Sequence, residues 1–230
     1  MLRKETVTSE TLELLKNLMK DDRLIPFTLV GGTALTLQIA HRQSIDIDLF
    51  TKQDFDESEL SNYLKANYKF NSDFMAKNTL KGEINGVKVD LITHAYPDAL
   101  EPLHLEGVRM ATLEDIAAMK LNAIVGSGSR VKDFTDIAYL SSYLSLKKMI
   151  QSYAAKYSGD NPAMALKALN FHNDINSKEP VHLLKGKFDW DKIVQRLREM
   201  TKEPDKIFTP MTFAEGKQRV VPKAKKGDDL

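Results

Sequence analysis

The stretch FTLVGGTALTLQIAHRQSIDIDLFT, residues 27–51, decides which fold the sequence predicts. Its first apolar run, residues 27–30, is typical of a short buried strand, and the pair Gly31-Gly32 ends that run. Residues 33–40 predict a helix, and residues 44–51 alternate apolar with polar side chains as a half-buried strand does. The stretch therefore predicts two strands with a glycine turn and a helix between them.

The second of these strands carries two aspartates. Residues two apart on a strand point to the same face, so Asp46 and Asp48 are expected to project together. Ile45, Ile47 and Leu49 are expected on the opposite, buried face. Two carboxylates at this spacing repel each other unless a cation lies between them, and Mg²⁺ or Mn²⁺ prefers oxygen ligands. The pattern predicts a divalent metal site that would hold the phosphates of a nucleoside triphosphate (NTP).

Two further features favour the same chemistry. Because glycine has no side chain, a phosphate can approach the backbone at Gly31-Gly32, where the start of a helix adds a positive dipole end. A third carboxylate, Asp90, lies in a strand predicted over residues 87–92. Taken separately, a glycine pair is usually a plain turn, and aspartates in an alternating strand usually form a solvated face. Their order and spacing together favour a nucleotidyltransferase, because carboxylates around two metal ions stabilise both oxygens of an in-line displacement.

Outside this stretch, the sequence predicts a mixed sheet followed by helices. Asn85-Gly86 between two short apolar strands is a strong hairpin signal, so at least four strands are expected before residue 110. We expect an α/β (α+β) core over residues 1–110, a helical domain over 111–201 and an extended or disordered tail over 202–230. The other predicted strand covers 80–84, and the helices cover 9–20, 57–66, 113–125, 131–144, 146–157, 162–171 and 189–201.

The composition excludes several classes of protein. The chain has 230 residues and no cysteine, which rules out disulfides, thiolate catalysis and cysteine zinc sites. No apolar run approaches the roughly 18 residues of a membrane span, and the first residues lack the core of a signal peptide. A cytoplasmic protein without a membrane partner is therefore expected. The net charge is +1, so contact with a nucleic acid would need a local basic patch.

The motifs also resemble a known family. Gly31-Gly32-Thr33 followed by Asp46-Ile47-Asp48 resembles the signature of the polymerase β-type nucleotidyltransferases. The segments ATLEDIAAMKLNAI and SRVKDFTDIAYL resemble the AbiEii/AbiGii toxin family, bacterial nucleotidyltransferases of phage-defence and toxin–antitoxin systems. The resemblance covers residues 27–144. It implies a nucleotidyltransferase-fold mixed sheet with flanking helices, a helical C-terminal domain, and transfer of a nucleotide from an NTP onto RNA, with tRNA as the expected acceptor.

The resemblance also assigns roles to residues. Asp46, Asp48 and Asp90 would be metal ligands, and Lys120 and Asp133 would join them as catalytic residues. The NTP would be held by Gly31, Gly32, Thr33, Arg42, Ser44, Lys120 and Lys132. Family members often carry an arginine where this chain has Ser127, and Arg130 is the candidate substitute.

Ordinary structural explanations remain open for several of these residues. Lys120 lies in an almost wholly apolar helix, so it must either extend to solvent or meet an anion such as a triphosphate. Lys132 and Asp136 are four residues apart and predict a common surface pair. His41 is expected to be an exposed residue at a helix end.

Two other functions remain as alternatives: a non-catalytic binding module of the same fold, and nucleotidyl transfer onto a small molecule or a protein. A basic strip beside the groove, with Lys120, Arg130 and Lys132 as candidates, would favour an RNA acceptor. An antitoxin protein, or a regulator of its gene, is a further expected partner.

Overall fold

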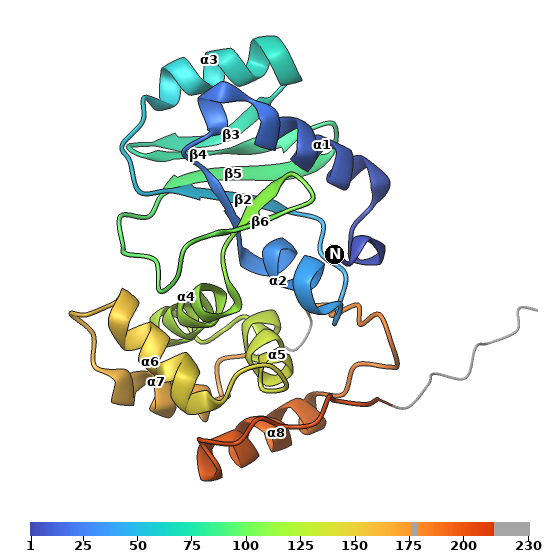
Figure 1. Cartoon of the computed structure of the whole chain (residues 1–230), viewed down its shortest axis with the longest axis vertical. Helices are drawn as coiled ribbons and strands as arrows, with labels where there is room; N and C mark the ends of the chain where they lie inside the picture. Colours follow the sequence, from blue (N-terminus) through green and yellow to red (C-terminus); the bar gives the residue numbers. More distant parts are fainter. Residues whose placement is uncertain (176–178, 214–230) are drawn as a thin grey trace, which may run out of the picture.

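The computed structural model describes residues 1–175 and 179–213, and a mixed sheet forms one end of the molecule (Figure 1). The strand order is β3-β4-β5-β2-β1-β7-β6. β2 pairs with β5 and β1 with β7 in parallel, and the other neighbours are antiparallel. The predicted mixed sheet is confirmed. The strands are β1 (Thr28–Val30), β2 (Ile47–Thr51), β3 (Asn71–Ala76), β4 (Thr79–Ile84), β5 (Val87–Thr93), β6 (Leu103–Leu105) and β7 (Val108–Met110).

The helices lie in two groups. Figure 1 shows α1 and α3 over the sheet, α4 to α8 at the other end of the molecule, and α2 between the two groups. No helix in the described part of the chain combines the length and apolar character needed to cross a membrane. The α-helices are α1 (Ser9–Lys20), α2 (Gly31–Ile39), α3 (Glu57–Tyr68), α4 (Leu113–Gly126), α5 (Val131–Leu140), α6 (Leu146–Lys156), α7 (Pro162–Leu169) and α8 (Trp190–Lys202), with short 3-10 helices η1 (Lys4–Thr6) and η2 (Asp22–Leu24).

Local sequence signals account for several of these boundaries. Thr8 caps α1 by accepting a hydrogen bond from the Thr11 amide, and Thr112 caps α4 in the same way. Asn85 and Gly86 both have positive φ, at 51° and 83°, as a two-residue hairpin turn between β4 and β5 requires. These signals act within a few residues, which is why the sequence predicts them well.

One continuous hydrophobic core joins the sheet to the helices. Leu29 of β1, Leu49 of β2, Ile116 of α4 and Phe134 of α5 belong to the same cluster and are all buried. Helix α4 lies at its centre, because it contacts α2, α5, α6 and α7. The two halves of the chain therefore stabilise each other, and the predicted domain boundary near residue 110 stays a prediction.

The structure corrects the predicted start of the second strand. β2 begins at Ile47, so Ile45 precedes the strand and is 61% exposed, although it was expected in the core. The cause is an interaction from outside the sheet. The Thr33 hydroxyl of α2 donates a hydrogen bond to the carbonyl oxygen of Asp46 and lies 3.0 Å from the Ser44 hydroxyl, which holds this segment against the helix.

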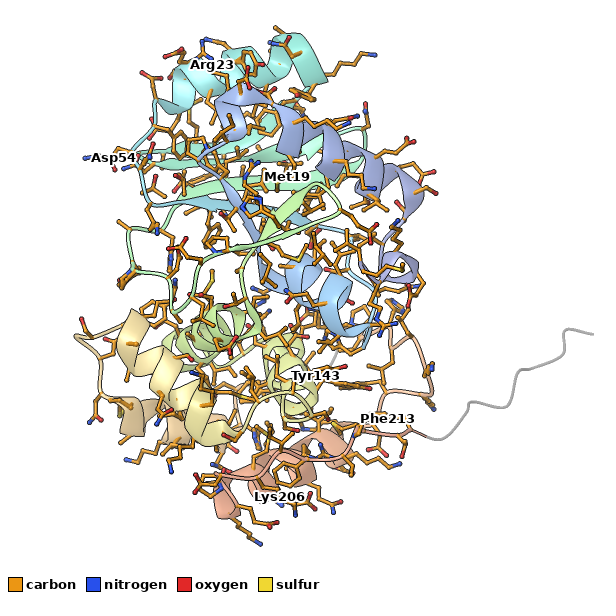
Figure 2. All side chains as sticks on the ribbon, viewed as in Figure 1. Met19, Arg23, Asp54, Tyr143, Lys206 and Phe213 are labelled. Atoms are coloured by element: carbon orange, nitrogen blue, oxygen red, sulfur yellow. The ribbon has the colours of Figure 1, made fainter. Side chains whose placement is uncertain are left out.

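The strand β3 was not predicted because its sequence lacks alternation and all six of its residues are exposed. At the other end of the chain, residues 203–213 form no regular element but pack onto the helices. Phe208 is buried, and its amide donates to the Ser141 carbonyl at 2.8 Å. Phe213 lies on the same side of the molecule as Tyr143 (Figure 2). Residues 214–230 of the predicted tail lie outside the described residues.

Candidate active site

A groove of about 660 Å³ lies between the sheet and the helices α2, α4 and α5. Among the predicted site residues, Thr33 does not line it, because Thr33 is 1% exposed and lies beneath the segment that it binds. Its role is therefore to position that segment. The predicted residues that line the groove are Gly31, Gly32, Arg42, Ser44, Asp46, Asp48, Asp90, Lys120, Lys132 and Asp133.

Two of the three predicted carboxylates are direct neighbours across the sheet. β2 and β5 run parallel, with Asp48 in register with Asp90, and both side chains line the groove. Asp46 lies just before β2 and is exposed at the same groove. Burial raises the pKa of Asp48 to about 6; Lys120 opposes this shift, and the charges of Asp90 and Asp46 add to it. A carboxylate in this position would gain from a nearby cation.

The carboxylates of Asp46, Asp48 and Asp90 are not arranged around a single metal position in this structure. Lys81 of β4 lies opposite Asp90, and its Nζ is 2.7 Å from Asp90 Oδ2. Within residues 1–175 and 179–213, no three His, Asp or Glu side chains are gathered closely enough to hold a metal ion. The donor chemistry still fits a hard divalent cation, because the carboxylates of Asp46, Asp48 and Asp90 line the same groove. Binding of such an ion would require Asp90 to turn from Lys81.

The start of α2 is shaped for close approach. Gly31 has φ +70°, and a Cβ at this residue would overlap the Asp48 carboxylate. A Cβ at Gly32 would lie 2.6 Å from Arg42 Nη2 and 3.1 Å from Ser44 Oγ. Among the described residues, no side chain caps α2 at Val30, so its first N–H groups face the groove region without a capping partner. An anion is a suitable ligand for such a helix start.

A buried group of charges forms the floor of the groove. Asp136 is fully buried and accepts hydrogen bonds from Arg42 Nε at 2.7 Å and Arg42 Nη2 at 2.9 Å. Lys120 Nζ lies 2.9 Å from Asp136 Oδ2 and donates to Asp133 Oδ1 at 2.6 Å. Burial alone would raise the pKa of Asp136, but Arg42 and Lys120 hold it well below its usual range. This group fixes two cations beside the carboxylates.

Comparison with known proteins identifies the family. The sequence model of a family described as "Nucleotidyl transferase AbiEii toxin, Type IV TA system" matches residues 13–210. This protein belongs to the AbiEii family. The AbiEii-family chain is also 30% identical over 158 residues to an uncharacterized protein of Aquifex aeolicus (strain VF5), covering 66% of this chain and 76% of that protein. It resembles the crystal structure of JHP933 from Helicobacter pylori with a TM-score of 0.51 and 17% identity, over 86% of this chain and 93% of that one. The family and the nucleotidyltransferase fold predicted from the sequence are confirmed.

The structure of this AbiEii-family protein corrects two expectations about charged residues. Lys132 does not pair with Asp136; its Nζ lies 2.9 Å from Glu179 Oε1. His41 is buried rather than exposed, with Nε2 2.8 Å from Asp136 Oδ1, because the end of α2 packs against α5. For Lys120 the second of the two expected alternatives holds, because it meets anions: the carboxylates of Asp133 and Asp136 on α5.

Asp136 is the residue whose importance sequence reasoning missed. The sequence predicted it as a surface partner of Lys132. The stronger signal was its apolar surroundings on α5, where Phe134, Ile137 and Ala138 are fully buried. A buried carboxylate needs cationic partners, and their identity cannot be read from the local sequence. Arg130 also lines the groove, with Nε 3.9 Å from Asp133 Oδ2, and its replacement of the arginine missing at Ser127 stays a prediction.

A late segment of the chain completes one wall of the groove. The Gln43 amide donates to the His182 carbonyl at 2.8 Å, and the Leu184 amide donates to the His41 carbonyl at 3.2 Å. Arg42 and Leu183 form a β-bridge between these two hydrogen bonds. The AbiEii-family protein thus holds the backbone around Arg42 by a segment about 140 residues away in sequence.

Proposed function

We propose that this protein transfers a nucleotide from an NTP onto an RNA acceptor, with tRNA as the expected target from the family resemblance. The observation that carries the proposal is the alignment of Asp48 with Asp90 on paired parallel strands, facing the same groove as the uncapped start of α2. Carboxylates and an anion-binding helix start at adjacent positions are what nucleotidyl transfer requires.

In this proposal, the triphosphate binds at the start of α2. Gly31 and Gly32 line the groove, and the N–H groups of the first helical turn can donate to the phosphates there. Arg42 and Ser44 lie directly against Gly32 and would contact the same phosphates. Lys120 adds a fixed positive charge to the groove, because the two acidic groups beside it raise its pKa against the lowering effect of burial.

The proposed positions of the α-phosphate and the acceptor hydroxyl follow from the order of the strands. β2 lies between β1, which leads into Gly31, and β5, which carries Asp90. The α-phosphate would lie at Asp48, and the acceptor hydroxyl would approach from the side of Asp90. The acceptor oxygen forms a bond to the α-phosphorus, the bond to pyrophosphate breaks, and Asp90 accepts the hydroxyl proton. Pyrophosphate then leaves on the side of Gly31 and Gly32, where the start of α2 borders the groove.

A divalent ion, Mg²⁺ or Mn²⁺, would be held by Asp48 and Asp90 together with Asp46. When bound, such an ion stabilises the negative charge of the reacting phosphate. The three carboxylates suit it chemically, and a bound cation would lower the pKa of Asp48, which burial raises to about 6. Binding of the ion would displace Lys81 from Asp90. This ion pair is weak, because both of its side chains are partly exposed.

The acceptor and the partners are inferred from the groove surface and the family. Lys88 and Arg130 are exposed residues that line the groove, and they provide local positive charge in a chain of net charge +1. Positive charge at a groove rim favours a polyanionic acceptor such as RNA. The family is described as the toxin of a type IV toxin–antitoxin system, which supports a toxin role and an antitoxin, or a regulator of its gene, as partner.

The decisive experiment measures whether radioactivity from each α-³²P-labelled NTP is transferred to RNA or to protein. The purified protein is incubated with one labelled NTP, Mg²⁺ and total RNA, and RNA and protein are separated. Label in RNA that is abolished in Asp48→Asn, but kept in the control Asp73→Asn on the exposed edge strand β3, supports the proposal. Label in protein alone would contradict the RNA acceptor. Label in neither fraction would contradict transfer onto RNA or protein.

A further inference from the structure

The groove changes character along β2. Val30 lies opposite Asp48, and Thr28 lies opposite Phe50, so Phe50 is farther from the start of α2 than Asp48 is. Two residues along a strand span roughly 7 Å. Three aromatic side chains, Phe50, His94 and Tyr157, line the groove, and Phe50 and His94 also line a smaller pocket that includes Lys52, Asp98, Asp115 and Lys156. We call these three residues the aromatic wall.

The rings of the aromatic wall are held in fixed positions. Phe50 and His94 have ring centroids 5.5 Å apart at an interplanar angle of 39°. The Tyr157 hydroxyl lies 3.2 Å from His94 Nε2, and its ring packs edge-on against His94 at 5.9 Å. Tyr157 is itself buried, so it supports His94 from behind. Phe50 and His94 are only partly buried, and their rings form part of the groove surface.

The aromatic wall is uncharged at neutral pH. Burial lowers the pKa of His94 to about 4, and the positive charge of Lys156 adds to this effect. Across the groove from the sheet, Met119 of α4 also lines this end. Flat neutral rings facing a polarizable thioether form a suitable slot for a flat, weakly polar group.

We propose that the aromatic wall binds a nucleobase by stacking it against Phe50 and His94. The inference rests on the proposed function, because the base would belong to a nucleotide whose reacting phosphate lies at Asp48. A ribose separates the phosphate of a nucleotide from its base, which fits the spacing between Asp48 and the wall. The base comes either from the incoming NTP or from the terminal nucleotide of the acceptor, since both present the same π face.

The test compares ligands with and without a base. Binding of each NTP and of inorganic tripolyphosphate, both with Mg²⁺, is measured by calorimetry for wild type, Phe50→Leu and His94→Leu. Leucine keeps the apolar volume but removes the ring. Loss of one stacking ring is expected to weaken binding of an NTP by about 5- to 150-fold while leaving tripolyphosphate binding unchanged. His94→Phe, which keeps a ring, should retain NTP binding, and Phe74→Leu on the exposed edge strand is the matched control.

The outcomes distinguish a base of the incoming NTP from a base of the acceptor. They also test base binding separately from the proposed nucleotidyl transfer. A loss confined to NTP affinity assigns the wall to the incoming nucleotide. An unchanged NTP affinity with a similarly raised KM for the RNA acceptor assigns it to the acceptor base. Equal NTP affinity and equal KM in all variants overturn the aromatic wall while the proposed transfer stands. If the wild type binds neither NTP nor tripolyphosphate, the proposed function itself is overturned.

Discussion

Replacement of Asp136 by asparagine tests the buried charges at the floor of the groove. The substitution keeps the size of the side chain but removes the negative charge that faces Arg42 and Lys120, both of which are almost completely buried. Removing one partner of a buried ion pair costs about 3–5 kcal/mol, because the other charge stays buried without compensation. In a protein of this size, each kcal/mol lowers Tm by about 2–4 °C. Asp136→Asn is therefore expected to lower Tm by about 6–20 °C.

The matched control is Asp205→Asn. Asp205 Oδ1 lies 2.7 Å from Lys147 Nζ, but these side chains are 72% and 58% exposed, so the loss of this pair is expected to cost less than about 1 kcal/mol. Differential scanning calorimetry of wild type and both variants gives the comparison. If Asp136→Asn melts within about two degrees of Asp205→Asn, the buried charges do not stabilise the fold and the reasoning fails.

The difference in Tm between wild type and Asp136→Asn is expected to depend on pH. The folded pKa of Asp136 lies well below its unfolded value of about 3.9, so its contribution to stability is complete above that value and is lost as the pH falls through the folded pKa. The difference in Tm between wild type and Asp136→Asn should be constant between about pH 6 and pH 8 and should narrow below about pH 4. A difference that widens on acidification would show that another group carries the effect.

Three further predictions concern the groove and the C-terminal segment. Asp48→Asn should reduce transfer on the order of a hundredfold or more, with Tm unchanged or higher because a repelling charge is removed; full activity in a transfer assay would refute the metal site. Gly32→Ala should weaken NTP binding measured by titration, since its Cβ would meet Arg42 and Ser44, and unchanged affinity would remove this glycine from the phosphate site. Phe208→Ala should destabilise the protein by about 3 kcal/mol in urea titrations, and a loss below about 0.5 kcal/mol would mean that residues 203–213 do not dock stably.

The sequence predicted those parts of the molecule that depend on short-range patterns. The glycine pair, the alternation around Asp48 and the turn at Asn85-Gly86 each specify local backbone. The turn is as predicted, whereas α2 already begins at Gly31 and β2 begins only at Ile47. Alternation over residues 44–51 predicted that Asp46 and Asp48 project together, because it fixes the direction of side chains on a strand, whereas Asp90 could be assigned only to another strand. The register that aligns Asp48 with Asp90 depends on the pairing of distant strands, and the sequence does not contain it in readable form.

Long-range contacts account for what was missed. Ile45 is exposed because α2 holds the preceding segment by a side-chain hydrogen bond, and no alternation rule includes such a contact. His41 is buried against Asp136. The sequence could not show this contact, because the two residues are 95 positions apart. The exposed strand β3 pairs only at the edge of the sheet, so it needs no apolar pattern.

The bridge between Arg42 and Leu183 has a consequence for synthesis of the protein on the ribosome. The carboxylates, the glycines and the buried cations are all translated before residue 140, but the segment that holds the loop around Arg42 emerges much later. A nascent chain that already contains every predicted site residue still lacks this wall of the groove. Premature termination or cleavage before residue 180 would therefore yield a fragment with the complete set of chemical groups and an incompletely assembled site.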